Sequence, residues 1–393
     1  MIRNIADLKH NWAMMTGGRA LACACIVAFA FSANYTNHAP LAPALSQTFG
    51  FSLALAGLLT TGIFLTHAAM QIPGGHLADR LGPRPIVTVA LAVVCAGNFA
   101  IAFSTAYWQL LLWKVFVGLG TGSCFVAGAR YIAGSFSGRR LNLAQGLYGG
   151  SVLLGSGFVI FGVSRVAAAF DWRGAFAATA GVAAIAWILW VIAAPSAPFR
   201  AQPAGSFRGL LSDFQLWLLG IVQMGSFGLV IVVSAWITMF LRRDLFLSQS
   251  RAGLLGSIAL LLGIVMRPLG GAMVHRLGVK RLFQFSLGLN IVGCFLLARA
   301  GGSPGRVMAA IVLLGIGSGL PYAALFVRAA ALYPGRAGAA MGLVNMLGII
   351  MILAAPPLIG QLVEWTGSFH VGFLSLGLFL LLAVAGTFGI KET

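Results

Sequence analysis

The chain has 393 residues, of which 60% are hydrophobic and only 8% carry a charged side chain. A soluble globular protein carries about 25% charged residues, because its surface must face water. The 25 Lys and Arg and the 7 Asp and Glu therefore exclude a soluble body of this length, and the high apolar content excludes intrinsic disorder. We interpret the net charge of +18 as basic loops beside a membrane, and we expect no nucleic-acid partner.

Apolar runs of about 20 residues, long enough to cross a bilayer as helices, recur along the whole chain. The alternation of a membrane β-barrel is missing, so the predicted fold class is an all-α membrane protein. The five Cys lie in these apolar runs without metal-site spacing, and we expect neither a metal nor a cofactor. Twelve transmembrane helices are predicted, over residues 19–45, 54–78, 85–104, 108–134, 141–170, 173–194, 212–241, 250–273, 279–299, 305–333, 337–364 and 368–390.

The basic residues of the short loops predict the orientation, because cytoplasmic loops of membrane proteins are enriched in Lys and Arg. With the N-terminus inside, the inner side holds 14 basic residues, the outer side 6 and the spans 5. We therefore expect a multi-pass protein of the cell inner membrane, embedded in the lipid bilayer as a monomer, with both termini in the cytoplasm.

The chain also repeats itself at half its length. The loop from Gly75 to Arg84 matches the loop from Gly271 to Lys280 at an offset of 196 residues. Residues 195–211 contain Pro, Ser, Gly and two Arg, a composition typical of a linker. The predicted organisation is an N-terminal six-helix bundle over 1–194, a cytoplasmic linker over 195–211 and a C-terminal six-helix bundle over 212–393, as two parallel repeats.

Two motifs resemble one known family. The pattern Gly75-x-Leu77-Ala78-Asp79-Arg80-x-Gly82-x-Arg84 resembles the signature loop of the major facilitator superfamily. A basic residue one turn before a glycine series, here Lys114 before Gly118, Gly120 and Gly122, resembles that family's fourth helix. The resemblance implies two pseudo-symmetric bundles that rock about a central site, which is a secondary transporter and not an enzyme.

The charges predicted to lie in the membrane are of one sign. The spans contain five cations, whereas the seven acidic residues all lie at span ends, in loops or in tails. An ionisable group in hydrocarbon is costly and needs a partner. Because the chain offers no carboxylate at central depth, we expect the counter-ion to be the cargo, a small anionic substrate.

Arg267, near the middle of span 250–273, is the main candidate for the charge contact. Its planar guanidinium suits a nitrate-like oxyanion or a carboxylate, whereas a structural role would have it bind backbone carbonyls freed by Pro268. The run Arg267-Pro-Leu-Gly-Gly resembles the nitrate/nitrite porters, which carry a second Arg at the matching place of span 2. Here that place is Gln71, so small carboxylates remain open as substrates beside nitrate and nitrite.

Other polar residues complete the predicted site. His67 lies one turn before Gln71 and would bind the anion, carry a proton or join two helices. Asn34, Tyr35 and His38 form a polar group in the first span, which would line the path or join helices. Weaker candidates at comparable depth, for which a structural role is favoured, are Tyr148, Gln223, Trp236, Tyr322 and Asn345.

A second set of residues is predicted to control the conformation. By resemblance, Asp79 faces a helix N-terminus across the bundle interface and holds the outward-open state, with Arg80 and Arg84 in the same loop. Arg130 and Arg328 are expected to pair with Asp79 or to cap helix ends. A role of Lys114 in proton coupling is implied by the resemblance alone. In addition, Arg165 is expected to pair with Asp171.

The sequence therefore predicts a transporter that moves a small anion across the inner membrane by alternating access. The alternative within the same superfamily is a proton-coupled multidrug or other solute exporter, which would need a buried acid. A sensor that has lost transport is a further alternative. The sequence leaves open the identity of the anion, the direction of transport, the coupling ion and which of Arg130, Arg165, Arg328 and Lys114 touch substrate.

Overall fold

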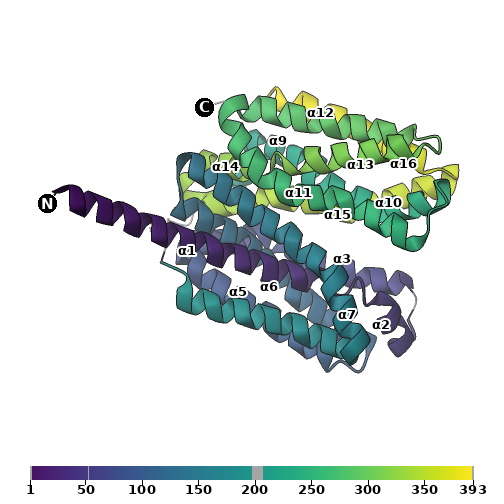
Figure 1. Cartoon of the computed structure of the whole chain (residues 1–393), viewed down its shortest axis with the longest axis horizontal. Helices are drawn as coiled ribbons and strands as arrows, with labels where there is room; N and C mark the ends of the chain where they lie inside the picture. Colours follow the sequence, from purple (N-terminus) through teal and green to yellow (C-terminus); the bar gives the residue numbers. More distant parts are fainter. Residues whose placement is uncertain (1, 52, 197–206, 392–393) are drawn as a thin grey trace.

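The structure, a computed structural model, describes residues 2–51, 53–196 and 207–391. Every regular element in these residues is a helix, and the long helices run side by side (Figure 1). Most of the predicted linker, at residues 197–206, lies outside the described residues.

The described residues of the N-terminal half form seven helical elements. α7 contains a sharp kink, because Phe170 and Asp171 have non-helical backbone angles. The expected first span of 19–45 is wrong at its end, since the helix stops at Thr36 and a separate short helix follows. The elements are α1 (Ile2–Thr36), α2 (Ala42–Phe49), α3 (Leu53–Ala69), α4 (Gln71–Leu81), α5 (Pro83–Ala102), α6 (Tyr107–Ser135) and α7 (Gly138–Ala193).

The C-terminal half includes a π-helical turn, η1, between two α-helices. The elements are α8 (Phe207–Leu211), α9 (Phe214–Gln223), η1 (Met224–Gly228), α10 (Leu229–Asp244), α11 (Gln249–Leu277), α12 (Val279–Ala298), α13 (Pro304–Gly319), α14 (Tyr322–Leu332), the 3-10 turn η2 (Pro334–Arg336), α15 (Ala337–Thr366) and α16 (Phe369–Thr387).

Ten stretches of the described residues are long and apolar enough to cross a membrane. The predicted spans 54–78 and 141–170 have no counterpart of their own among these ten. The first is divided at Met70 into α3 and α4, because Pro73 has no N–H to donate to the carbonyl of Ala69. The second is the first part of α7, so the count of twelve spans stays a prediction.

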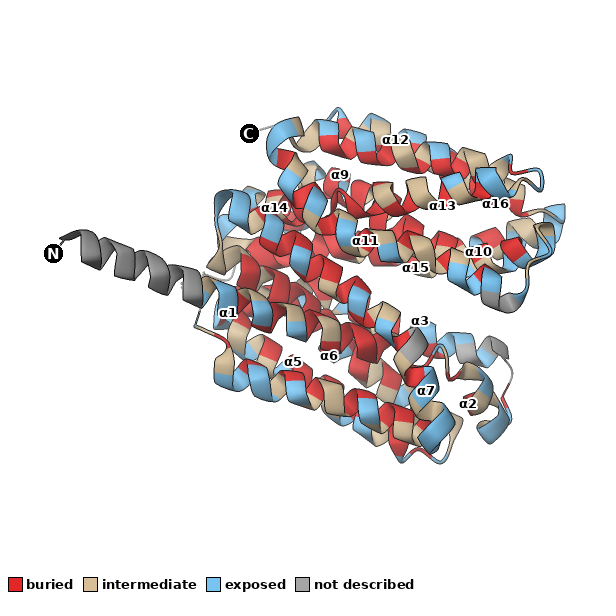
Figure 2. Ribbon diagram, viewed as in Figure 1, coloured by how far each residue is buried: buried red, intermediate tan, exposed pale blue. Residues whose placement is uncertain are grey.

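Glycines let the helices of each half approach closely. In α6, a Cβ on Gly118 would collide with the Ile63 carbonyl and the Thr66 hydroxyl of α3. Close approach of backbones gives the van der Waals contact that holds membrane helices together, since lipid is as apolar as the side chains. Exposed residues lie along the outer faces of the long helices (Figure 2). Many exposed side chains are apolar, such as those of Ile192 and Leu382, and these suit contact with lipid.

The two halves meet along a seam. α7 packs against α11, and α4 packs against α15. At Gly75 of α4 and Gly338 of α15 the backbones touch, because a Cβ on either residue would overlap the other's carbonyl. We call the end of the molecule with the turns at Gly82 and Gly278 the basic end, because the loops predicted to be cytoplasmic lie there.

The glycine packing predicts a stability difference between two like substitutions. Gly118→Ala should destabilise the protein by about 1–3 kcal/mol, because the new methyl group overlaps the backbone of α3. Gly181→Ala in α7 is the matched control, since a Cβ there meets nothing within 4 Å. Thermal unfolding of the purified protein should show a lower Tm for the first variant alone, and equal Tm values would contradict this packing.

Candidate functional site

Arg267 lies at the seam and not against lipid. Its side chain, on α11, is only 2% exposed, and its Nη1 donates to the carbonyl of Gly149 on α7 at 2.6 Å. The guanidinium carbon lies 4.2 Å from the ring centre of Tyr322 and 5.4 Å from that of Phe227. The main-chain partner belongs to the opposite half of the chain, so the cation bridges the two halves between aromatic rings.

Among the buried polar atoms of the described residues that have no hydrogen-bond partner, three belong to Arg267, Tyr322 and Gln71. They are the Nε of Arg267, the hydroxyl of Tyr322 and the Oε1 of Gln71. Leaving a polar atom buried and unbonded costs about 1–3 kcal/mol. Such atoms can therefore bind a ligand or water, and two of the three are donors suited to an anion.

Tyr35 and His67 continue this cluster within the N-terminal half. Their rings lie 5.6 Å apart. His67 Nδ1 shares a hydrogen bond of 2.9 Å with the Thr121 hydroxyl, and Gln71 Nε2 donates to the His67 carbonyl at 3.3 Å. The structure thus joins Tyr35, His67 and Gln71 by direct contacts, whereas in the described part of the chain no hydrogen bond or ring contact joins these three to Arg267.

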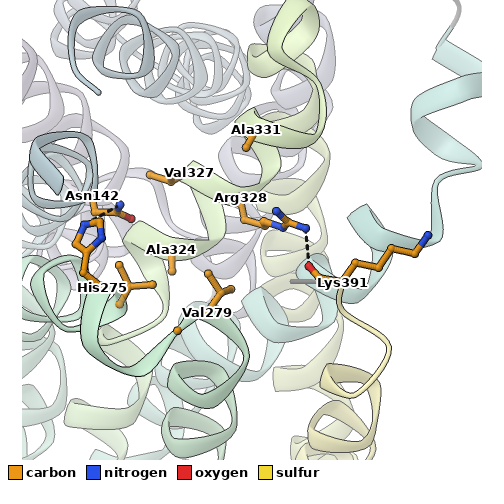
Figure 3. Close-up of a pocket in the computed structure, with 10 residues that line it drawn as sticks. Asn142, His275, Val279, Ala324, Val327, Arg328, Ala331 and Lys391 are labelled. Carbon is orange, nitrogen blue, oxygen red and sulfur yellow. Dashed lines mark hydrogen bonds between the residues drawn. The ribbon is translucent and has the colours of Figure 1, made fainter. Parts of the chain in front are cut away.

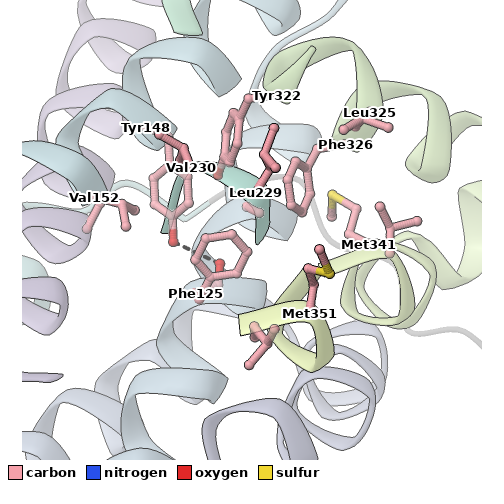
Figure 4. Packing of buried hydrophobic residues seen from close by; sticks show 14 of the residues in the cluster. Phe125, Tyr148, Val152, Leu229, Val230, Tyr322, Leu325, Phe326, Met341 and Met351 are labelled. Atoms are coloured by element: carbon pink, nitrogen blue, oxygen red, sulfur yellow. Dashed lines mark hydrogen bonds between the residues drawn. The ribbon is translucent and has the colours of Figure 1, made fainter. Parts of the chain in front are cut away.

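Aromatic rings from both halves of the chain pack together around Tyr322, the residue that contacts Arg267 (Figure 4). Phe125 of α6 and Phe326 of α14 make an edge contact at 5.6 Å across the seam, and Tyr322 lies 4.7 Å from Phe326. Tyr148 of α7 donates to the carbonyl of Phe125 at 2.8 Å. A site of low polarity with few donors strengthens each electrostatic contact inside it.

Asn34 and His38 belong to a different network. Asn34 Nδ2 donates to the Thr179 carbonyl at 2.9 Å, and Lys114 Nζ donates to the Asn34 carbonyl at 3.1 Å and to Asn37 Oδ1 at 2.5 Å. His38 Nε2 shares a hydrogen bond of 2.8 Å with the Thr60 hydroxyl. All these partners lie in α1–α7, so the described contacts favour the helix-joining role for both residues.

Sequence reasoning missed two groups at the seam. The carbonyl of Gly149 and the ring of Phe227 contact Arg267, but a backbone carbonyl and a phenylalanine give no signal in an apolar sequence. Of the weaker candidates, Tyr322 contacts Arg267, whereas Gln223 and Asn345 bond to each other at 3.0 Å.

At the basic end, Asp79 caps a helix of the opposite half. Its two carboxylate oxygens accept from the N–H groups of Gly338 and Ala339, each at 3.0 Å, in the first turn of α15. Arg130 Nε donates to the same carboxylate at 2.8 Å. Both contacts were expected, and an anion at a helix N-terminus is stabilised by the helix dipole.

The other predicted conformational residues have different partners. Arg80 is exposed, and Arg84 donates to the Val191 carbonyl at 2.9 Å. Arg328 does not pair with Asp79, because its guanidinium is directed to the carbonyl of Lys391. The expected ion pair between Arg165 and Asp171 is wrong, because Asp171 instead accepts from the backbone N–H groups of residues 173 and 174 at the start of a helix.

Comparison with known families agrees with this fold. The family model of the Major Facilitator Superfamily matches residues 24–244 and, a second time, residues 216–392. The chain belongs to the Major Facilitator Superfamily, and it is a multi-pass membrane protein.

Individual relatives are similar over most of the chain. The probable nitrate/nitrite antiporter NarK1 of Thermus thermophilus is 23% identical over 87% of this chain and 84% of its own length. The probable sulfoacetate transporter SauU of Cupriavidus necator is 22% identical over 91% and 89%. The solved proton:xylose symporter XylE, at 15% identity, has the same fold with a TM-score of 0.81 over 97% of both chains. These relatives are transporters and not enzymes.

The capping contact of Asp79 leads to a prediction about the seam. Asp79→Asn should weaken the hydrogen bonds between residue 79 and the first turn of α15, because a hydrogen bond to a charged group contributes about 1.5–3 kcal/mol. We expect at least tenfold faster alkylation of a cysteine introduced by Ala339→Cys, at a site that is fully buried in the closed seam. Mass spectrometry of the modified peptide measures the rate.

Asp213→Asn provides the control for this measurement. Asp213 also caps a helix, since it accepts from Gln215 N–H at 2.8 Å, but donor and acceptor lie in the same half. Its loss should leave the alkylation rate at position 339 unchanged. Equal rates in the Asp79→Asn variant and the parent would show that the cap does not hold the seam.

Proposed function

We propose that this chain is a secondary transporter that moves a small anion across the inner membrane by alternating access, with Arg267 as the main charge contact. The observation that carries the proposal is a buried guanidinium at the seam whose Nε lacks a partner in the described residues. The names of the relatives, a nitrate/nitrite antiporter and a sulfoacetate transporter, support an anionic cargo.

The substrate class is an inorganic oxyanion such as nitrate or nitrite, or a small carboxylate. Arg267 offers its fork of donors to a planar anion, and the Tyr322 hydroxyl adds another donor beside it. Gln71, His67 and Tyr35 bound the same region, and the Gln71 amide supplies a neutral contact. A single cation suits a single negative charge on the cargo.

Alternating access follows from the position of this cation between the halves. We take residues 1–194 and 212–393 as the moving units, with the basic end facing the cytoplasm. The contacts of Asp79 and Gly75 with α15 close that end, so the anion enters from the opposite side. When the units rock, Arg267 and Gly149 move apart. The site then releases the anion on the inner side of the membrane, or accepts another anion in exchange.

A proton-coupled exporter of cations is less well supported. Such a carrier would need a carboxylate in the route, and the one acidic residue at the seam among the described residues, Asp79, is engaged by Arg130 and α15. Exchange of anions, or symport through His67, therefore fits these residues better.

Removal of the guanidinium tests the proposal directly. Arg267→Gln should lower uptake of the transported anion into proteoliposomes at least tenfold, because a buried charge-assisted contact of about 1.5–3 kcal/mol is lost. Arg267→Lys keeps the charge without the planar fork and should retain intermediate activity. Arg251→Gln on the same helix is the control, since Arg251 is exposed. Unchanged uptake in Arg267→Gln would refute the proposed role.

The unpartnered hydroxyl of Tyr322 gives a second, milder test. Tyr322→Phe should weaken anion affinity about threefold to tenfold without lowering the Tm, because a neutral hydrogen bond contributes about 0.5–1.5 kcal/mol and this hydroxyl bonds to no described protein group. Tyr131→Phe should do the reverse, since the Tyr131 hydroxyl donates to the Pro195 carbonyl at 2.7 Å. A lowered Tm with unchanged affinity in Tyr322→Phe would assign that hydroxyl a structural role.

A further inference from the structure

Side chains that donate to main-chain carbonyls join segments of the C-terminal half at several points. At the basic end, Arg328 donates to the carbonyl of Lys391 (Figure 3). Within α12, the fully buried side chain of Asn290 donates through its Nδ2 to the carbonyl of Gly225 at 2.9 Å. The second acceptor belongs to the π-helical turn η1, which distinguishes this contact from an ordinary one between two helices.

The π-turn leaves the Gly225 carbonyl without its usual partner. In an α-helix each N–H donates to the carbonyl four residues earlier, which would pair Leu229 with Gly225. Here the Leu229 N–H donates instead to the carbonyls of Met224 and Ser226. A buried carbonyl without a hydrogen bond destabilises the conformation that leaves it so. The Asn290 amide supplies the missing donor, and it therefore favours the π-turn over a regular α-helix at this place.

The π-turn sets the direction of Phe227. This residue lies within η1, and its ring centre is 5.4 Å from the guanidinium carbon of Arg267 on α11. Leu229, which follows the turn, belongs to the same packed cluster as Tyr322 and Phe326 (Figure 4). A π-turn contains one residue more than an α-turn, so its conversion to α-helix would rotate the two flanking segments relative to each other. That rotation would turn the Phe227 ring away from the arginine.

Asn290 is itself held in one orientation by α13. Its Oδ1 accepts from the Ser318 hydroxyl at 3.5 Å, and a Cβ on Gly317 would overlap that oxygen. Because a carbonyl can only accept, the amide nitrogen must be the atom that faces Gly225. Both polar atoms of this side chain thus have protein partners, and any effect of Asn290 on the anion site is exerted through η1.

We propose that Asn290 is a positioning residue for the anion site, since it holds the Gly225 carbonyl, maintains the π-turn and so places Phe227 against the guanidinium of Arg267. The rings of Phe227 and Tyr322 then fix the guanidinium, and its Nε, which has no partner among the described residues, is available to cargo. The functional part of this inference rests on the proposed anion role of Arg267. The contact between ring and guanidinium can be measured without any anion.

A fluorine label tests the positioning in the absence of ligand. We replace Phe227 by para-fluorophenylalanine in the full-length protein in nanodiscs, and fluorine NMR then reports the surroundings of the ring. Arg267→Gln should change this signal in the otherwise unchanged protein, because it removes a cation from the ring. The response to Arg267→Gln should be largely lost in Asn290→Leu protein, in which the π-turn has lost its donor.

Ser286→Ala is the matched control. Ser286 is also fully buried on α12 and donates to a main-chain carbonyl, that of Gly317 on α13, but it does not bond to η1. The fluorine signal should keep its full response to Arg267→Gln in this variant. Asn290→Ala, which removes the amide without adding bulk, gives the same comparison if Asn290→Leu fails to fold.

The proposal is overturned by any of the following results of the fluorine measurement. The signal at position 227 could ignore Arg267→Gln in the parent protein, or its response could survive loss of the Asn290 amide. Equal loss of the response in Ser286→Ala would show a general loosening of α12 and no specific action on the π-turn.

Uptake of nitrate and of lactate into proteoliposomes measures the functional part. Asn290→Leu and Phe227→Leu should each lower the uptake that depends on Arg267 about threefold to tenfold, because each removes the same contact between ring and cation. Combined, they should lower it no further, since residues that act through one contact are not additive. Additive losses would show that Asn290 acts elsewhere. Uptake that ignores Arg267→Gln would refute the proposed function and leave the fluorine result standing.

Discussion

A guanidinium buried between two halves of a membrane protein is the constraint from which the rest of this structure follows. A charge removed from water is expensive unless other groups compensate it, and Arg267 has one carbonyl and two aromatic rings as described partners. This compensation is incomplete, because its Nε is unbonded within the described residues. In the function that we propose, an anion at this place completes the compensation, and the cost of burying the cation gives a preference for negatively charged cargo.

The same seam holds both the proposed site and the proposed gate. Arg267 contacts α7 at the Gly149 carbonyl, and Asp79 caps α15 at the basic end. Because Gly75 and Gly338 allow the backbones to touch there, opening the basic end must break many contacts together. A rigid-body motion of this kind would change the surroundings of the cation at the same time, which links binding to the direction of access.

The sequence predicted those features that depend on the spacing of apolar runs and motifs and on the sign of the charged residues. Apolar runs predicted the helical membrane fold, and the resemblance of the signature loop predicted the contact of Asp79 with a helix N-terminus. The position of Arg130 in its span predicted that it would pair with Asp79 or cap a helix end, and it pairs with Asp79. The sequence could not assign the partners of polar side chains within a helix, because it does not say which neighbouring helix each face of that helix contacts. Asn34 therefore bonds within its own half, and Asp171 caps a helix where an ion pair was expected. The backbone carbonyl that receives Arg267 has no sequence signature at all.

The most direct test of the central claim is a thermal-shift screen of the purified protein against nitrate, nitrite, cyanate, formate, oxalate, lactate and a lipophilic cation. The account predicts that one or a few anions raise the Tm of the wild-type protein and have no effect on Arg267→Gln. Stabilisation by the cation alone, or by an anion to the same degree in both proteins, would contradict an anion site built on this guanidinium.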